Sequence, residues 1–271
     1  MRRHELTDNL FAGCRFCVPE QWRKCPVWMD ECERWLGFLK EKGAWEKFHP
    51  RLTARQDQFW ETLGEIEAAY FLERVVAVGE VRLSEPPGSD GHVGDLTLTA
   101  DTVDIYCEVK CLGWKQDVKR EEGRRSPRLQ GNKFEKGGNK VYRDRNADYI
   151  RGSVEREYAD LPCGQATLHV IRDDLTIPEL WIPPYRNVHF VCYHRPEPPP
   201  YPDQVPGVFM TDQFRNLGGV VLLLPEPGEG EGRMNYRHVY ARNSRAVHPL
   251  PGVLSERLQC ITEARACPLD S

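Results

Sequence analysis

The sequence of 271 residues contains no apolar run long enough to cross a bilayer. Its longest run, GGVVLLL at residues 218–224, is far shorter than the about 20 residues that a membrane helix needs. The first ten residues, MRRHELTDNL, include no continuous apolar segment, so we expect no secretory signal. From these absences we expect a cytoplasmic protein that has no membrane partner.

Several signatures of common enzyme classes are also missing. We find no P-loop, no dinucleotide-binding fingerprint, no Ser/His/Asp arrangement and no internal repeat. The formal net charge of −4 excludes a protein that binds nucleic acid through an overall positive charge. Hydrophobic residues make up 40% and charged residues 29% of the chain, which is typical of soluble globular proteins.

The order of the predicted elements indicates the fold class. Residues 55–75 have apolar side chains at helical spacing and no proline, and residues 75–111 alternate as three strands would. We expect a helix at about residues 140–158 and buried strands at 166–171, 187–193 and 219–224. This order predicts an α/β fold with a mixed central β-sheet flanked by helices.

The N-terminal residues differ in composition from the rest of the chain. Residues 1–50 hold four of the ten cysteines and four of the seven tryptophans. We interpret them as a small Cys/Trp-rich appendage that is helical from about residue 30 to 40. We expect the core at residues 51–245 and a C-terminal tail at residues 246–271.

The stretch GDLTLTADTVDIYCEVKCLGW, residues 94–114, is the most informative part of the sequence. Side chains two residues apart share one face of a strand. In a hairpin that turns at residues 101–102, each apolar residue meets an apolar partner: Leu96 with Cys107, Leu98 with Ile105, and Ala100 with Val103. The same register places Asp95 opposite Glu108, with Lys110 one step along the strand.

Two directly opposed carboxylates repel each other, and a divalent cation between them would remove that repulsion. Mg²⁺ suits such a site because it prefers oxygen ligands and binds through one or two carboxylates. A metal-bound water becomes a nucleophile near neutral pH, and Lys110 could orient it. In the alternative interpretation, Glu108 and Lys110 form a solvated salt bridge and Asp95 is a turn residue.

An acid at Asp95, twelve intervening residues, and then Glu108-Val109-Lys110 resemble the motif of the PD-(D/E)XK nuclease superfamily. The resemblance covers about residues 55–195 and implies a restriction-endonuclease-like αβββαβ core. It implies hydrolysis of phosphodiesters, which we expect in DNA, with Mg²⁺ or Mn²⁺. Asp95 and Glu108 would ligate the metal, with the carbonyl oxygen of Val109 as a third ligand.

The family pattern also implies an acid on the helix before the strands. GEIEAAYFL supplies Glu65 and Glu67, and Glu65 is favoured because an acid followed by a large aliphatic residue resembles that pattern. Gly94 departs from the proline that the family often has before the first acid. The alternative function is a catalytically inactive nucleic-acid-binding protein on the same fold. Whether the chain forms a homodimer stays open.

A basic segment follows the predicted site directly. Residues 115–151 contain twelve Lys or Arg and six Asp or Glu, which is a local charge of +6. Such a segment could contact a phosphate backbone, or it could be a solvated loop of mixed charge. The predicted nucleic-acid-binding residues are Lys115, Lys119, Arg120, Arg124, Arg125 and Lys140.

The N-terminal cysteines allow a second metal hypothesis. Cys14 and Cys17 form a C-x2-C pair, which Cys25 and Cys32 follow. Thiolates at this spacing suit Zn²⁺ or an iron–sulfur cluster, but no second C-x2-C pair completes the set. The three alternatives are therefore zinc, a cluster, or cysteines that are buried as small apolar residues. A cysteine-metal interaction protein is a further alternative function.

Overall fold

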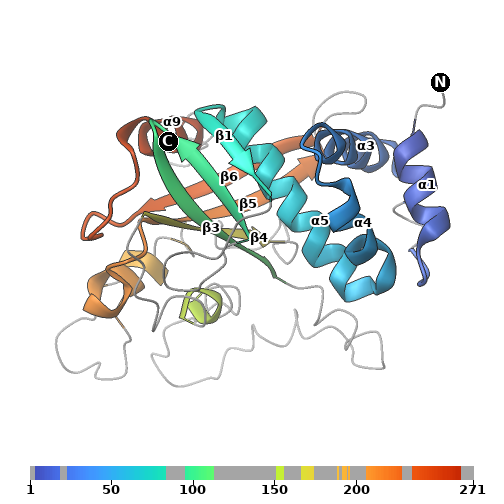
Figure 1. Cartoon of the computed structure of the whole chain (residues 1–271). Coiled ribbons are helices and arrows are strands. Elements are labelled where there is room, and N and C mark those ends of the chain that lie inside the picture. Colours follow the sequence, from blue (N-terminus) through green and yellow to red (C-terminus); the bar gives the residue numbers. More distant parts are fainter. Residues whose placement is uncertain are drawn as a thin grey trace, which may run out of the picture.

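The computed structural model describes residues 4–18, 23–83, 95–112, 151–155, 166–173, 188, 191–193, 195, 206–227 and 234–263. In these residues the fold is mixed α/β, with a six-stranded mixed sheet flanked by helices (Figure 1). This agrees with the predicted fold class. The strands lie side by side in the order in which they occur in the chain.

The sheet combines antiparallel and parallel pairs. Its first three strands are antiparallel, β4 is parallel to β3, β5 is parallel to β4, and β6 is antiparallel to β5. The strands are β1 (Gly79–Arg82), β2 (Leu96–Ala100), β3 (Val103–Leu112), β4 (Thr167–Asp173), β5 (Gly219–Pro227) and β6 (Met234–Arg242). The strands predicted at 75–111, 166–171 and 219–224 are confirmed.

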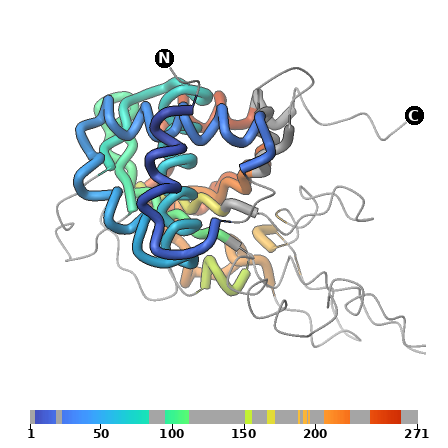
Figure 2. Tube along the Cα trace, turned by 90° about the vertical axis from the view of Figure 1, so that its right-hand side faces the viewer, coloured from blue at the N-terminus to red at the C-terminus, as the bar shows by residue number. Residues whose placement is uncertain are grey.

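Helices precede and follow the sheet in the chain. They are α1 (Glu5–Gly13), α3 (Pro26–Glu41), α4 (Trp45–Ala54), α5 (Gln56–Tyr70), the π-helical turn η1 (Phe71–Val76), the 3₁₀ turns η2 (Val208–Met210) and η3 (Asp212–Phe214), and α9 (Gly252–Glu263). Figures 1 and 2 show the N-terminal helices, in blue, gathered beside α5. None of the helices in the described ranges is long and apolar enough to cross a membrane.

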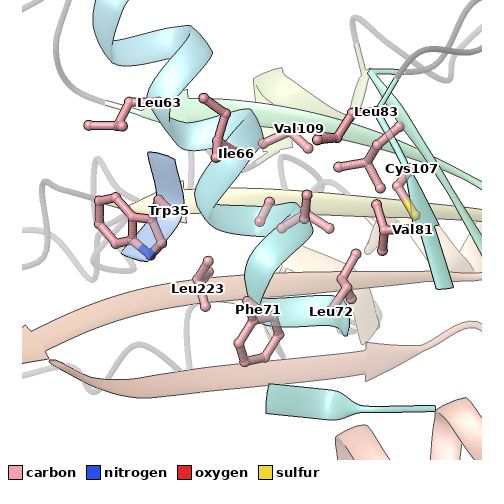
Figure 3. Packing of buried hydrophobic residues seen from close by; sticks show 14 of the residues in the cluster. Trp35, Leu63, Ile66, Phe71, Leu72, Val81, Leu83, Cys107, Val109 and Leu223 are labelled. Carbon is pink, nitrogen blue, oxygen red and sulfur yellow. The ribbon is translucent and has the colours of Figure 1, made fainter. Parts of the chain in front are cut away.

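Helix α5 and the turn η1 confirm the helix predicted at residues 55–75. Their apolar stripe, which includes Leu63, Ile66 and Phe71, is fully buried. These side chains meet Cys107 and Val109 of β3 in one cluster (Figure 3). The helix therefore holds one face of the β2–β3 hairpin, and any polar residue on α5 near β3 is fixed relative to the strands.

The apolar packing is continuous across both predicted domain boundaries. Trp28 and Trp35 of α3 are buried in the same cluster as α5 and the sheet, although residue 50 was the predicted boundary. Leu254 and Leu258 of α9, which lie in the predicted tail, belong to that cluster as well. The domain division stays a prediction, and the packing gives no sign of it.

The β2–β3 hairpin has the predicted register. Leu96 pairs with Cys107, Leu98 with Ile105, and Ala100 with Val103. The turn residues Asp101 and Thr102 have φ angles of 49° and 66°, which is the pattern of a two-residue type I′ turn. Because this turn fixes the pairing, every residue of β2 has one defined neighbour on β3.

The strand predicted at residues 187–193 is wrong, because the described residues of this segment, 188 and 191–193, are helical. Val188, Val191 and Cys192 are buried, and their spacing of three and four residues puts them on one face of a helix. A short apolar run cannot be assigned to a strand or a helix by its hydrophobicity alone. Strand β6 and helix α4 were not predicted at all.

Gly79 marks a close approach between β1 and β2 that can be tested. A Cβ atom at Gly79 would lie 2.0 Å from the carbonyl oxygen of Thr99, whereas nothing lies within 4 Å of a Cβ built at Gly37 in α3. We expect Gly79→Ala to lower the free energy of unfolding by about 1–3 kcal/mol or more, because the backbones must separate. The matched Gly37→Ala should raise it by about 0.5–1 kcal/mol. Urea unfolding of both variants checks this, and equal effects would contradict the close approach.

Candidate active site

The two predicted metal ligands on the hairpin come together as the register requires. Asp95 immediately precedes β2, and its Oδ2 accepts a hydrogen bond from the backbone N–H of Val109 at 2.8 Å. This contact places the Asp95 carboxylate beside the segment of β3 that carries Glu108. The carbonyl of Val109 as a third metal ligand stays a prediction.

Lys110 pairs with Glu108 on the same face of β3. The Lys110 Nζ lies 2.6 Å from Glu108 Oε1, and both side chains are partly exposed. On the neighbouring strand, His169 aligns with Glu108 in the parallel register, so both side chains leave the sheet on the same side. His169 is buried as predicted, and its Nε2 lies 2.9 Å from Ser153 Oγ.

Glu65 also reaches this site, from the opposite element. It is buried on α5, and its carboxylate is held by Arg51 of α4 through two hydrogen bonds. Arg51 Nη1 donates to Glu65 Oε2 at 2.7 Å, and Nη2 donates to Oε1. The predicted acid on the helix is therefore near the hairpin, but a guanidinium occupies both of its oxygens. Sequence analysis did not identify Arg51.

The electrostatic surroundings of Glu65 connect it to the strands. Burial raises the pKa of Glu65 to about 7, and the nearby charge of Asp95 raises it further against the opposing effect of Arg51 and Lys110. Burial disfavours the ionised form because a charge in the interior loses its hydration. Glu65, Asp95 and Lys110 thus interact across the boundary between α5 and the sheet.

Six charged residues form one interacting group, which we call the carboxylate cluster. The neighbours of Arg51 include Glu65, Asp95 and Glu61, and Lys110 joins Glu108 and Glu65. The cluster holds four carboxylates and two cations, so its formal charge with every group ionised is −2. Its members are Arg51, Glu61, Glu65, Asp95, Glu108 and Lys110. A single divalent cation would neutralise it.

The cluster fits a hard divalent cation in its donor chemistry and charge, because its anionic groups are all carboxylates. Within the described residues, however, no three His, Cys, Asp or Glu side chains stand close enough together to hold a metal ion. The contacts explain this, because Arg51 holds both oxygens of Glu65 and Lys110 holds one oxygen of Glu108. Asp95 and Glu108 are the residues that would bind first, and Glu65 could join only after leaving Arg51.

The four N-terminal cysteines do not form a site among the described residues. The Cys14 thiol contacts the carbonyl oxygens of Leu10 and Leu52, Cys32 is buried, and Cys17 is exposed. Burial raises the pKa of Cys14 to about 11 and that of Cys32 to about 12, so both are protonated thiols rather than thiolate ligands. The zinc or iron–sulfur hypothesis for Cys14, Cys17, Cys25 and Cys32 stays a prediction that this geometry does not support.

The basic residues predicted to bind nucleic acid lie outside the described residues. This applies to all six: Lys115, Lys119, Arg120, Arg124, Arg125 and Lys140. Their role stays a prediction from the sequence. Helix α4 adds a basic residue on the described side of the site, since the Lys47 Nζ lies 3.4 Å from the carbonyl oxygen of Leu83, where β1 ends.

The raised pKa of Glu65 predicts a specific dependence of stability on pH. The folded protein binds the Glu65 proton more tightly than the unfolded chain does, where the pKa is near 4.5. The contribution of Glu65 to the free energy of unfolding is therefore greatest below pH 4.5 and is lost as the pH rises to about 7. Relative to Glu65→Gln, the wild type should lose up to about 3 kcal/mol over this range.

Urea unfolding of the wild type and Glu65→Gln at a series of pH values measures this loss. Glu61→Gln, one turn earlier on α5 and partly exposed, is the matched control. A difference between wild type and Glu65→Gln that stays constant with pH, or grows as the pH rises, would contradict the raised pKa.

Comparison of the chain with protein-family models, with curated proteins and with solved structures finds no match.

Proposed function

We propose that this protein is a Mg²⁺-dependent nuclease that hydrolyses phosphodiester bonds, in DNA as the preferred substrate. The observation that carries the proposal is the carboxylate cluster. Asp95, Glu108 and Glu65 come from three separate elements and approach one point, together with Lys110, in a group of formal charge −2. A structural salt-bridge network has no need of excess negative charge in a half-buried place, whereas a divalent cation site does.

The arrangement of the elements supports a restriction-endonuclease-like core. Helix α5 is followed by the antiparallel strands β1 to β3, then by the helical residues 151–155, and then by β4 parallel to β3. This is the αβββαβ order that the motif implies. The site lies where α5 meets the paired strands β2 and β3, so its acids are held by rigid elements.

The residues would divide the chemistry among them. Asp95 and Glu108 would hold the Mg²⁺, or Mn²⁺, which when bound polarises the phosphate and lowers the pKa of a bound water. Lys110, held 2.6 Å from Glu108, would stabilise the negative charge that develops on a phosphate oxygen as water attacks phosphorus and the P–O bond breaks. Glu65 adds negative charge from the buried side of the site.

The first test is cleavage of labelled linear and circular DNA with Mg²⁺ or Mn²⁺. We expect the wild type to cut only with the cation, and Asp95→Ala, Glu108→Ala and Lys110→Ala each to lose about 100-fold or more of the rate. Asp104→Ala is the matched control, because Asp104 is an exposed carboxylate on the same strand that pairs with Arg82. It should retain wild-type activity.

The circular substrate also distinguishes cleavage within a strand from cleavage at an end. RNA substrates in the same assay test the preference for DNA. If the wild type cuts neither DNA nor RNA with either cation, the enzyme proposal is wrong and a binding protein on this fold takes its place. Full activity in folded Asp95→Ala would also overturn the assignment.

A further inference from the structure

Arg51 stands between the buried acid of the site and the solvent. The side chain of Glu65 is 8% exposed and that of Arg51 is 33% exposed, so the guanidinium covers the carboxylate from the outside. Arg51 also lies near Asp95, one of the two acids proposed to hold the metal. A substrate that approaches the proposed metal from the side of α4 would therefore meet this guanidinium.

The geometry of Arg51 suits two different partners equally well. A guanidinium binds a carboxylate through two parallel N–H groups, and the same fork binds two oxygens of a phosphate. Glu65 now takes both bonds. A phosphate group of the substrate and the Glu65 carboxylate therefore compete for one donor pair.

We propose that Arg51 is a substrate-phosphate-binding residue that Glu65 holds until a divalent cation draws Glu65 away. This inference rests on the proposed function, because it needs a cation at the carboxylate cluster and a phosphodiester as substrate. The cation and Arg51 share the Glu65 carboxylate, and binding of the cation weakens the hold of Glu65 on Arg51. The released fork then binds a phosphate oxygen next to the metal.

The packing around Arg51 allows this exchange without a large movement. Its guanidinium carbon lies 5.3 Å from the centre of the Phe48 ring, which is three residues earlier on α4 and fully buried. The ring supports the plane of the guanidinium from below through a cation–π contact. Only the polar edge of Arg51 changes partner, while the stem stays on Phe48.

The charges of the cluster predict opposite effects on the two ligands. With Arg51 the cluster has a formal charge of −2, and without it −3. Removal of Arg51 should therefore strengthen the binding of a cation and free Glu65 for it, but weaken the binding of a phosphate. A residue that only stabilises the fold would not strengthen one ligand while weakening the other.

The experiment measures both ligands separately from catalysis. Titration calorimetry gives the affinity of the protein alone for Mg²⁺. Fluorescence anisotropy gives its affinity for a short DNA duplex, in EDTA and in Ca²⁺, a hard cation of the same charge that serves as the probe for the bound state. Each is measured for the wild type, Arg51→Ala and Arg51→Lys. Arg55→Ala is the matched control, because Arg55 is exposed and pairs with Asp57 at the start of α5.

We expect Arg51→Ala to bind Mg²⁺ several-fold more tightly than the wild type, and to bind the duplex about tenfold more weakly in Ca²⁺. Its DNA affinity should fall less steeply with salt, by about one phosphate contact. In EDTA the two proteins should bind DNA about equally, because Glu65 then holds Arg51 in the wild type. Arg51→Lys, which keeps the charge and loses the fork, should lie between them.

Several outcomes would overturn the inference. Weaker Mg²⁺ binding by Arg51→Ala, or the same loss of DNA affinity in EDTA as in Ca²⁺, gives Arg51 a structural or a general electrostatic role. If Arg51→Ala does not fold, Arg51→Lys decides, and unchanged DNA affinity in Ca²⁺ counts against the fork. If the wild type binds neither Mg²⁺ nor DNA, the proposed function fails as well. If it binds both and the Arg51 variants behave like Arg55→Ala, only this inference fails.

Discussion

The register of the β2–β3 hairpin is the constraint on which the candidate site depends. A slip of one residue would turn Leu96 and Leu98 out of the core and would separate Asp95 from Glu108 and Val109. Burial of the apolar face and the tight turn at Asp101 and Thr102 together forbid that slip. The position of the acids is therefore decided by the hydrophobic core on the other side of the same strands. The site needs no separate interaction to hold its two strands in place.

The sequence was sufficient for this part of the molecule because alternation along a strand and pairing across a hairpin are local patterns. Leu96, Cys107 and their neighbours could be assigned to faces without knowledge of the rest of the fold. Arg51 could not be found in this way, because its contact with Glu65 joins two helices, and Pro50 within α4 obscures the helical pattern around it. Residues 187–193 failed for the opposite reason, since a compact apolar segment fits either kind of element.

Glu65 shows how a site is placed in a core at a cost. A helix position that faces the strands would be more stable with an apolar residue, and a buried ion pair often contributes less than the apolar packing that could replace it. The neighbours of Glu65 on α5, Leu63 and Ile66, follow the apolar rule, so Glu65 is a local exception in an otherwise consistent helix. Such exceptions are expected where function, rather than stability, decides the residue. The covering guanidinium of Arg51 reduces the cost while leaving the carboxylate in place.

The order of the strands has a consequence for how the chain is made. Because each strand of the sheet lies next to the one before it in the sequence, every strand emerging during synthesis finds its partner already present. The exception is the outer side of β5, whose buried residues Val220 to Leu223 stay uncovered until β6 is complete. An apolar strand with an open edge attracts other chains, so the last part of the protein to be synthesised also protects the nascent sheet from aggregation. Charged Glu80 and Arg82 serve the same purpose on β1 at the opposite edge, where the strand is short.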